Sequence, residues 1–468
     1  MKRNSRAQSA FSSLIATLRV VLSFAAVFLI FGFAGATAAP GPRPIVVRST
    51  LIPGPDQGVR GPFGPFVVLA DLDYGYAAGM VRYYHGGYIW VDVYAPFLWL
   101  ERDNSATLFK LREDLAEVES RYITNGVTPD GKTVVGAVVF LDDATNAPWV
   151  WTREKGLQFL DTPSPFEETG GALAVSKDGN LISGIVGNFI HPPIQAAIWK
   201  ERFFELLPSS QPWSTVGGVE AVRQRPMTTD GKVIVGASGE KYANMQATSW
   251  VDGTERPLAT GNAVSSGATF VTDGGTIFGT GTLPDGRIVL MRWDSSGNLE
   301  TFIPPNGLSV VDLRAVNSTG TAAGGSLAVK SSCISSGDPD CDRAPFFWTR
   351  PPISPQNGIF TILPENGHEH FFTYSVVTDI SDDARIVTGS LIAGVRTDGD
   401  PPDVAFLWRK DTGMVIVNDL MPDRAPDYYS SYRLSRNGNR VLVTGNPPQA
   451  TDETTKSLIL DLIWPTDH

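Results

Sequence analysis

Short apolar runs, each bounded by Gly, Asp, Asn or Pro, make up the hydrophobic pattern of the chain. The stretch VTPDGKTVVGAVVFLDDATNAPWVWTREKGLQFL, residues 127–160, shows this pattern clearly. Val, Ile, Trp and Phe dominate the runs, which is typical of β-strands. We predict four strands in this unit, in the segments NGVTPDG, KTVVGAV, APWVWT and GLQFL. No stretch has the periodicity of a long amphipathic helix, so the pattern predicts an all-β protein.

The same unit recurs along the chain, marked by a Gly in its second strand and a Trp in its third. The eight pairs are Gly79/Trp99, Gly136/Trp151, Gly184/Trp199, Gly236/Trp250, Gly279/Trp293, Gly324/Trp348, Gly389/Trp408 and Gly445/Trp464. Successive glycines are 43 to 65 residues apart, a spacing that suits propeller blades and exceeds most solenoid repeats. We therefore expect one domain, residues 39–468, folded as a β-propeller of four-stranded blades with eight repeats. A seven-bladed ring is the alternative if the first repeat, with its atypical strand FVVLADL, packs irregularly.

The two ends of the repeat region predict how the ring closes. The last repeat stops after its third strand, SLILDLIWP, and an unassigned apolar run, PIVVRSTLI at 44–52, precedes the first repeat. This N-terminal run can supply the missing fourth strand of the last blade and remove an exposed edge.

Two recurring features have a structural and a functional interpretation. Asp-Gly at 130–131, 178–179, 230–231 and 273–274 suits hairpin turns with left-handed backbone, whereas calcium sites or sialidase-like Asp boxes are the alternative. The box needs an Asp-x-Gly step, and here Gly follows Asp directly, so we favour hairpin chemistry. We likewise interpret the tryptophans as packing between blades rather than as platforms for sugars.

The N-terminus has the features of a secretory signal peptide. Lys2, Arg3, Arg6 and Arg19 precede an apolar run from Val20 to Phe33 and then AGATAAP, which predicts cleavage after Ala38. An uncleaved membrane anchor is the alternative, although the run is shorter than the ~20 residues of a membrane span. Cleavage leaves 34 basic and 49 acidic residues, a net charge of −15, which argues against nucleic acid and anionic membrane surfaces as partners.

The chain has only two cysteines, Cys333 and Cys341, in CISSGDPDC. In an exported protein such a close pair predicts a disulfide that closes a short loop. A zinc site would need four ligands, and only Asp338 and Asp340 lie near.

Long loops on one face predict a ligand-binding surface. The interval between the marker Gly and Trp is 14 or 15 residues in repeats 2 to 5, but 24, 19, 19 and 20 residues in repeats 6, 7, 8 and 1. These repeats are neighbours in a closed ring, and variable loops on a rigid scaffold are common binding sites. The candidate ligand-binding residues are Tyr83, Tyr84, His85, Tyr88, Trp90, Arg396, Asp398, Tyr428 and Tyr429. They suit a carbohydrate or protein partner, unless the aromatic residues only cover the loops themselves.

Catalysis and cofactors have little support in the sequence. No G-x-S-x-G, P-loop or H-E-x-x-H motif occurs, and the near pair His368 and His370 would need metal ligands from other loops. We expect no cofactor and no metal, and a monomeric, non-enzymatic binding protein. A secreted glycosidase or lyase that acts on polysaccharide is the alternative, because propellers host many chemistries.

The repeats resemble a known family. Units of the form A-V-S-x-D-G, followed by APFLW at 95–99, APFFW at 344–348 and VAFLW at 404–408, resemble the HAF family of bacterial extracellular repeats. The resemblance covers nearly all of the chain after residue 38, but Ala or Pro stands where the His-Ala of the signature would be, as in a divergent member. It implies an exported bacterial propeller without assigned activity. Some members carry autotransporter barrels, and none follows Trp464, so we expect a periplasmic or secreted protein.

Overall fold

The computed structural model describes fifteen segments of the 468-residue chain, all of them built from strands, turns and short 3-10 segments. They are residues 43–53, 65–85, 91–109, 120–140, 145–162, 169–187, 193–217, 224–241, 244–328, 343–350, 358–363, 375–391, 404–421, 427–446 and 456–465. The prediction of an all-β protein is confirmed. The predicted signal peptide and both cysteines lie outside these residues. Within them, no helix is long and apolar enough to span a bilayer.

The strands follow the predicted repeats in chain order. An N-terminal strand, β1 (Ile45–Leu51), precedes them. The first two repeats are β2 (Pro65–Asp71), β3 (Tyr76–His85), β4 (Val91–Leu100), β5 (Ser105–Leu108), and β6 (Ser120–Val127), β7 (Thr133–Phe140), β8 (Asn146–Thr152), β9 (Gly156–Phe159). The next two are β10 (Gly170–Val175), β11 (Leu181–Val186), β12 (Gln195–Lys200), β13 (Phe203–Leu206), and β14 (Trp213–Val216), β15 (Val233–Gly239), β16 (Gln246–Val251), β17 (Thr254–Pro257).

The second half of the chain continues the series. Repeats 5 and 6 are β18 (Ser265–Val271), β19 (Ile277–Thr282), β20 (Ile288–Trp293), β21 (Leu299–Phe302), and β22 (Ser309–Val316), β23 (Ala322–Ala328), β24 (Arg343–Thr349), β25 (Ile359–Ile362). Repeats 7 and 8 are β26 (Val376–Ile380), β27 (Ile386–Leu391), β28 (Val404–Arg409), β29 (Gly413–Ile416), and β30 (Asp427–Leu434), β31 (Arg440–Asn446), β32 (Lys456–Ile463). Short 3-10 turns occur at Glu101–Asp103 (η1), Pro305–Gly307 (η4) and Val417–Leu420 (η6).

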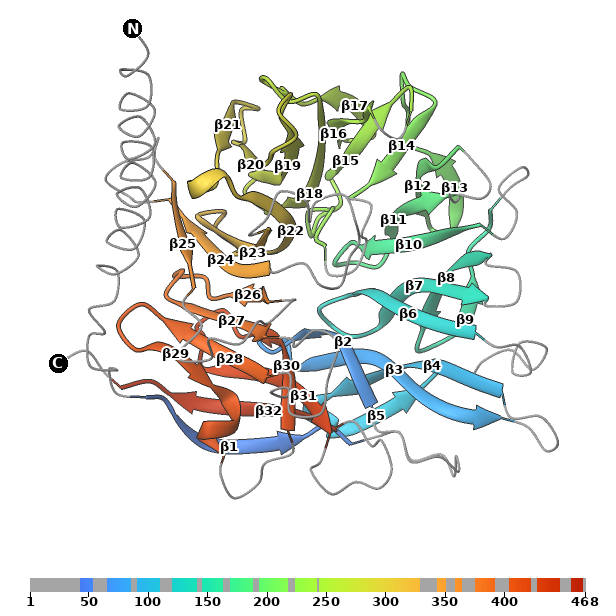
Figure 1. Cartoon of the computed structure of the whole chain (residues 1–468). Coiled ribbons are helices and arrows are strands. Elements are labelled where there is room, and N and C mark those ends of the chain that lie inside the picture. Colours follow the sequence, from blue (N-terminus) through green and yellow to red (C-terminus); the bar gives the residue numbers. More distant parts are fainter. Residues whose placement is uncertain are drawn as a thin grey trace, which may run out of the picture.

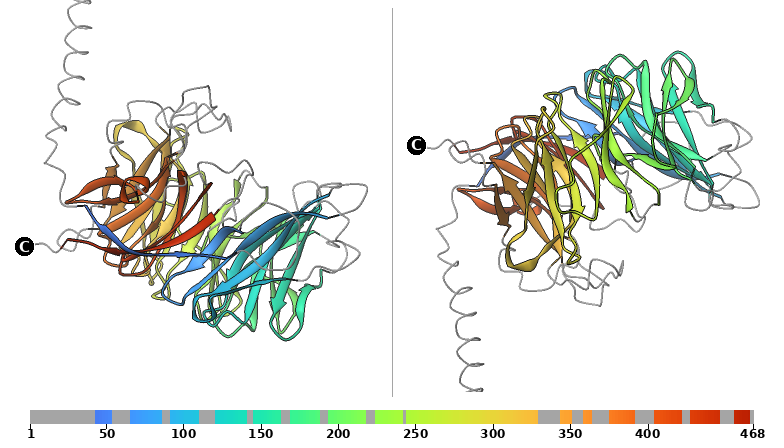
Figure 2. Two further views of the ribbon diagram at one scale, coloured as in Figure 1. Left: turned by 90° about the horizontal axis from the view of Figure 1, so that it is seen from below. Right: turned by 90° about the horizontal axis from the view of Figure 1, so that it is seen from above.

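The strands form antiparallel sheets that succeed one another around a common centre (Figure 1). Among the described residues there are seven sheets, six of four strands and one of eight strands. The larger sheet contains the first two repeats, which are joined by a short parallel pairing of β4 with β6. The first strand of each repeat lies toward the centre, and the fourth strand lies at the outside (Figures 1 and 2).

The N-terminal strand belongs to the last sheet. β1 pairs antiparallel with β32, from Ile45 opposite Ile463 to Leu51 opposite Leu458, and the sheet order is β1-β32-β31-β30. The blue strand β1 accordingly runs beside the red strands of repeat 8 (Figure 2). Ile52, just beyond β1, is only 1% exposed and donates its backbone N–H to the Ser457 carbonyl (2.9 Å). β1 is therefore bound to the far end of the chain by both a backbone ladder and a core residue.

Repeats 8 and 1 also contact each other directly. One core cluster combines Val67, Leu72 and Trp99 of repeat 1 with Leu442 and Ile459 of repeat 8. Beside it, the Arg440 guanidinium donates to Glu101 Oε1 (2.6 Å), Asp461 Oδ1 (2.9 Å) and the Leu72 carbonyl (2.8 Å).

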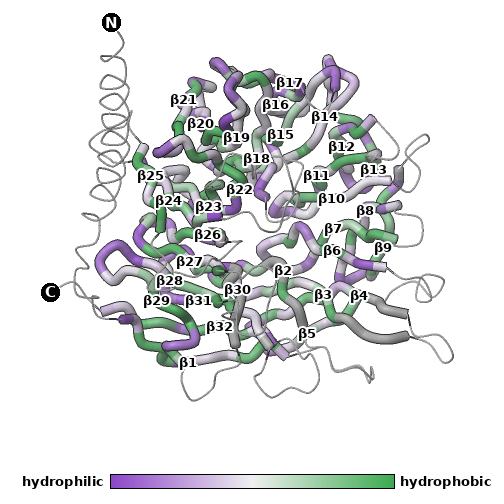
Figure 3. Tube along the Cα trace, viewed as in Figure 1, coloured by the Kyte–Doolittle hydropathy of each residue, from purple (hydrophilic) through white to green (hydrophobic). Residues whose placement is uncertain are grey.

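The recurring tryptophans are part of the core between sheets. Trp99, Trp199, Trp250, Trp293 and Trp348 are fully buried, and Trp151 and Trp408 nearly so. The Trp199 indole N–H donates to the Asp161 carbonyl (2.8 Å), in the segment that connects the preceding sheet to its own. Equivalent bonds join Trp250 to Pro208 and Trp293 to Ala259. These contacts confirm the predicted packing for the seven buried marker tryptophans, and Figure 3 shows hydrophobic residues along most strands. The marker of repeat 8 differs, since Trp464 is only half-buried and its indole N–H donates to the Gly438 carbonyl of its own repeat (3.0 Å).

The recurring glycine of the second strand has a packing cause. In most repeats the first strand has a bulge opposite it, as between Ala268 and Phe270 in repeat 5. The bulge directs the Gly267 carbonyl onto Gly279, where a Cβ would overlap it. In repeat 6 the glycine that contacts the first-strand carbonyl, that of Asp312, is Gly325. The predicted marker Gly324 is therefore one residue before the structurally equivalent position.

Candidate functional site

The turns between the first and second strands are built from short polar side chains. In repeat 2 the Thr128 hydroxyl donates to Asp130 Oδ1 (2.8 Å), which also accepts the Lys132 backbone N–H (3.0 Å). Gly131 follows with φ of +67°, a conformation that glycine adopts without a steric penalty. The arrangement recurs at Ser176–Asp178–Gly179, Thr228–Asp230–Gly231 and Ser435–Asn437–Gly438.

The turn carboxylates accept hydrogen bonds from hydroxyl and N–H groups of their own turn. Hydrogen bonds from the Ser176 hydroxyl and the Asn180 backbone N–H lower the pKa of Asp178 below its ordinary value. Bonds from the Thr228 hydroxyl and the Lys232 N–H do the same for Asp230. Hairpin chemistry is thus confirmed at 130–131, 178–179 and 230–231.

The turn of repeat 5 differs from its predicted frame. Gly275, not Gly274, has the left-handed backbone (φ +79°), and its N–H bonds to the Thr272 carbonyl (2.9 Å). Thr272 is therefore the counterpart of Thr128, and Asp273 comes one position before the usual turn carboxylate. The predicted hairpin at 273–274 is present between β18 and β19, but its left-handed residue is Gly275, because the second of two adjacent glycines closes this turn.

One position in every turn lines a central cavity of about 530 Å³. It is the residue directly after Thr128 or its counterpart in the other repeats, which is a Ser or Thr in all but repeats 1 and 6, and we call the set the inner ring. The inner ring consists of Asp73, Pro129, Lys177, Thr229, Asp273, Ser318, Asp382 and Arg436. The cavity volume falls in the range of about 300–1,000 Å³ that is usual for ligand pockets.

Hydrogen bonds link inner-ring residues of adjacent repeats. The Lys177 N–H donates to the Thr229 carbonyl (2.8 Å), and the Thr229 N–H donates to Asp273 Oδ1 (2.8 Å). On the other side of the ring, Ser318 donates to Asp382 through its hydroxyl and its N–H. These bonds hold the turns at fixed positions around the cavity, independently of the sheets.

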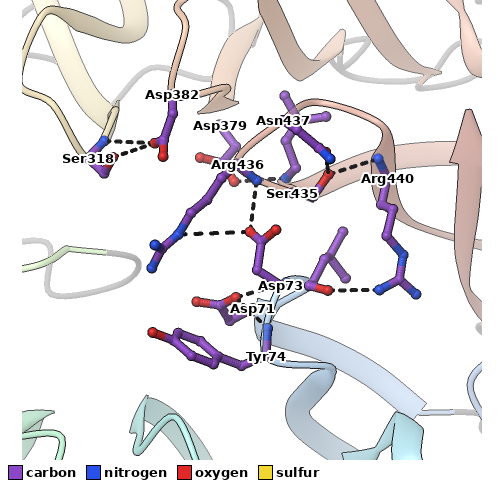
Figure 4. Close-up of polar contacts among 12 residues, drawn as sticks. Asp71, Asp73, Tyr74, Ser318, Asp379, Asp382, Ser435, Arg436, Asn437 and Arg440 are labelled. Carbon is purple, nitrogen blue, oxygen red and sulfur yellow. Dashed lines mark hydrogen bonds and ion pairs between the residues drawn. The ribbon is translucent and has the colours of Figure 1, made fainter. Parts of the chain in front are cut away.

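Hydrogen bonds between inner-ring residues also connect the last repeat to the first (Figure 4). The Asp382 N–H donates to the Arg436 carbonyl, and the Arg436 N–H donates to Asp73 Oδ2, each at 2.8 Å. The Arg436 guanidinium lies over the Tyr74 ring, 5.6 Å from its centroid. The Asp71 carboxylate accepts the N–H groups of Asp73 and Tyr74 at 3.0 and 3.1 Å, which orders this turn.

A second layer of charged side chains lines the cavity below the inner ring. Asp379 accepts the Leu434 N–H at Oδ2 (2.8 Å) and the Ile380 N–H at Oδ1 (3.0 Å). Burial raises the pKa of Asp379, although the positive charges of Arg433 and Arg225 oppose the rise.

Three arginines contribute to the same wall: Arg225, Arg314 and Arg433. Arg314 forms an ion pair with Asp312. Arg225 is exposed and Arg433 is half-buried, and the charges of both act on Asp379. Tyr76 also lines the cavity, and burial together with the charge of Asp71 raises its pKa, so the phenol stays protonated. The wall thus offers guanidinium groups, a phenol and carboxylates at fixed positions.

The predicted ligand-binding residues fall where the structure describes the backbone at most. Tyr83, Tyr84 and His85 belong to β3 and Tyr428 and Tyr429 to β30, but their side chains lie outside what the structure describes. Tyr88, Trp90, Arg396 and Asp398 lie wholly outside the described residues, as do Cys333 and Cys341.

Sequence reasoning missed the inner ring, although a signal was present. The position before the turn carboxylate carries Lys177, Asp382 or Arg436 in some repeats and Pro129 or Thr229 in others. Charged residues at one recurring turn position are a usable signal, but the one-residue shift in repeat 5 concealed Asp273. Among the described residues, no group of three or more His, Cys, Asp or Glu side chains could hold a metal ion.

Comparisons with known proteins show no family for this chain. No family model matches the chain, and no curated protein matches it. Among solved structures, the β-propeller domain of the trilobed protease from Pyrococcus furiosus has a TM-score of 0.44 at 10% identity, covering 79% of this chain and 100% of that one. The fold follows from the chain's own topology, because antiparallel sheets that succeed one another around a common centre form a β-propeller.

Two further propeller neighbours are equally distant in sequence. Prolyl oligopeptidase B from Galerina marginata has a TM-score of 0.48 at 12% identity, covering 81% of this chain and 55% of that one. TolB from Acinetobacter baumannii has a TM-score of 0.31 at 13% identity, covering 73% and 79%. At these identities the likeness concerns the fold alone.

Proposed function

We propose that the chain is an exported, non-enzymatic propeller that binds a carbohydrate or protein partner at its central cavity. The observation that carries the proposal is the convergence of residues from all eight repeats on one cavity of about 530 Å³. Hydrogen bonds between turns hold its mouth in place, so a ligand would meet preorganised donors and acceptors, which lowers the entropic cost of binding. The long loops of repeats 6, 7, 8 and 1 would enlarge the binding surface on the opposite face.

The charges of the wall indicate what a ligand must present. Arg225 and Arg433 would receive a carboxylate or another anionic group, because guanidinium binds such groups through paired hydrogen bonds. Asp273 and Asp382 at the mouth would accept hydroxyl or amide donors. An acidic oligosaccharide or an acidic peptide segment offers both kinds of group.

The proposal includes a ring of eight blades closed by β1, in a divergent member of the HAF repeats. The register of β1 on β32 supports closure, as do the core cluster shared by repeats 8 and 1 and the Arg440–Glu101 ion pair. The bond from the Arg436 N–H to Asp73 supports it at the inner ring. A closed ring keeps the cavity walls at a fixed separation, which a preformed binding site requires.

Replacing Arg225 and Arg433 together by Ala should weaken ligand binding strongly and leave the fold intact. The measurement uses an array of acidic and neutral oligosaccharides and peptides, followed by titration calorimetry with the probes that bind. We expect acidic probes to bind the unchanged protein, and the double variant to lose about 100-fold in affinity, since each charged hydrogen bond contributes ~1.5–3 kcal/mol.

Arg256→Ala is the matched control, because Arg256 is an exposed arginine on the outer strand β17. It should bind as the unchanged protein does. Equal binding by the double variant would contradict a cavity site, and chemical turnover of a bound oligosaccharide would contradict the non-enzymatic assignment.

A further inference from the structure

A second hollow, of about 370 Å³, lies away from the central cavity and collects positive charge. Among the described residues that line it, five are basic, Arg102, Lys132, Arg153, Lys155 and Arg202, and one, Glu154, is acidic. This composition is unusual for a chain whose net charge is −11. We call this site the basic hollow.

Three consecutive repeats build the basic hollow. Arg102 lies in η1 of repeat 1, Arg153 and Lys155 lie in the turn between β8 and β9, and Arg202 lies between β12 and β13. The backbone N–H of Arg153 donates to the Lys132 carbonyl (3.3 Å), which joins two turns of repeat 2. The site therefore depends on how neighbouring repeats pack, not on one flexible loop.

Most of these cations are accessible to a ligand. The Lys132 side chain is 74% exposed and its ion pair with Asp130 (2.9 Å) is a surface pair, which contributes little and yields easily to a stronger anion. Arg202 is different, since it is half-buried and its guanidinium donates to the Gln158 side chain of repeat 2. This contact directs the Arg202 guanidinium across the boundary between repeats 3 and 2.

The backbone at Arg202 is an independent observation. Glu201 and Arg202 both have left-handed backbone, with φ of +49° and +79°. The equivalent turn of repeat 4 has the same conformation, φ +50° and +77°, but with Asp252 and Gly253, the residues that such a turn favours. An arginine thus occupies a glycine position at an energetic cost, and residues held in unfavourable conformations concentrate at functional sites.

We propose that the basic hollow binds a phosphate-bearing ligand, with Arg202 as the positioned guanidinium and the four other cations supplying charge. A phosphate group carries close to two negative charges at neutral pH and several acceptor oxygens, so it balances more of this charge than a carboxylate does. Arginine presents paired donors that match phosphate oxygens. The basic hollow is separate from the central cavity and does not depend on the function proposed for it.

The test is Arg202→Gly, which restores the residue that the turn favours. Calorimetric titration with inorganic pyrophosphate at low salt should show binding by the unchanged protein that weakens as salt is added. Arg202→Gly should bind about tenfold or more weakly, because a charged hydrogen-bonding group is lost. Its melting temperature should stay nearly unchanged, since relief of the turn offsets the lost bond to Gln158. Loss of binding without loss of stability separates a ligand contact from a structural one.

Two controls locate the effect. Lys410→Ala removes an exposed lysine from the equivalent turn of repeat 7, between β28 and β29, and should bind pyrophosphate normally. The Arg225 and Arg433 double variant should also retain pyrophosphate binding. The absence of binding by the unchanged protein, equal binding by Arg202→Gly, or loss of binding in either control would overturn the proposal.

Vesicles of phosphatidylglycerol distinguish the two sources of phosphate. Co-sedimentation that pyrophosphate competes away would identify a lipid headgroup as the ligand, whereas pyrophosphate binding without vesicle binding would identify a soluble phosphate compound. Both results support the site, while vesicle binding that pyrophosphate leaves unaffected would contradict it.

Discussion

Deletion of residues 39–52 is expected to give a protein that aggregates and melts at a lower temperature. The deletion removes β1 and so exposes the backbone of β32 as an unpaired edge, which favours association between molecules. It also removes Ile52 from the core between repeats 8 and 1. Loss of one buried isoleucine alone costs ~3 kcal/mol, so we expect a decrease in melting temperature of at least about 5 °C. Differential scanning calorimetry and size-exclusion chromatography measure the two effects.

Supplying the strand at the other end should reverse the loss. Appending PIVVRSTLI after His468 through a flexible linker allows it to fold back antiparallel to β32. We expect this permuted protein to recover solubility and most of the lost melting temperature. If the truncated protein stays monomeric with an unchanged melting temperature, β1 is not needed to complete the last blade.

The second large effect concerns the glycine beneath the bulge of the first strand. Gly279→Ala should lower the free energy of unfolding by about 3 kcal/mol, as expected for an overpacked core position. The added Cβ would overlap the Gly267 carbonyl, which the bulge between Ala268 and Phe270 holds against Gly279. Urea denaturation monitored by tryptophan fluorescence measures the change.

Gly267→Ala is the matched control in the same pair of strands. Gly267 lies in β18, and a Cβ at this position would meet open space. Its substitution should change the free energy of unfolding by no more than about 0.5 kcal/mol. Similar losses for both variants would mean that general strand propensity, and not the bulge, requires glycine at Gly279.

The strand pattern could be predicted because it depends on local chemistry. The segment of repeat 2 contains an apolar run in each strand. Gly131 follows the turn carboxylate in the short turn that connects β6 to β7. The role of Trp199 was predictable too, because a large aromatic residue that recurs at one strand position is buried by packing between repeats.

The hydrogen bonds of the inner ring could not be predicted, because they join turns that are far apart in sequence. The bond from Arg436 to Asp73 joins residues 363 positions apart, and nothing local in either turn indicates it. The bulges shift the register of most first strands, so which of their side chains face the cavity depends on geometry that the alternation of residues does not reveal. In repeat 5 the choice between Gly274 and Gly275 decides where Asp273 lies, and both glycines permit the turn.

A disulfide between the two end strands tests most directly whether β1 closes the ring. Ile45 and Ile463 face each other in the register of β1 and β32, and both are exposed, at 65% and 56%. In a background with Cys333→Ser and Cys341→Ser, Ile45→Cys with Ile463→Cys should form a disulfide on mild oxidation, since paired strand positions have Cβ atoms about 4.5–5.5 Å apart. Non-reducing electrophoresis and peptide mass spectrometry detect it. Ile45→Cys with Ile359→Cys, at an equally exposed outer-strand position of repeat 6, should remain reduced. A disulfide in the first pair alone is the result that a ring closed by β1 predicts, and its absence, or its formation in both pairs, would contradict that closure.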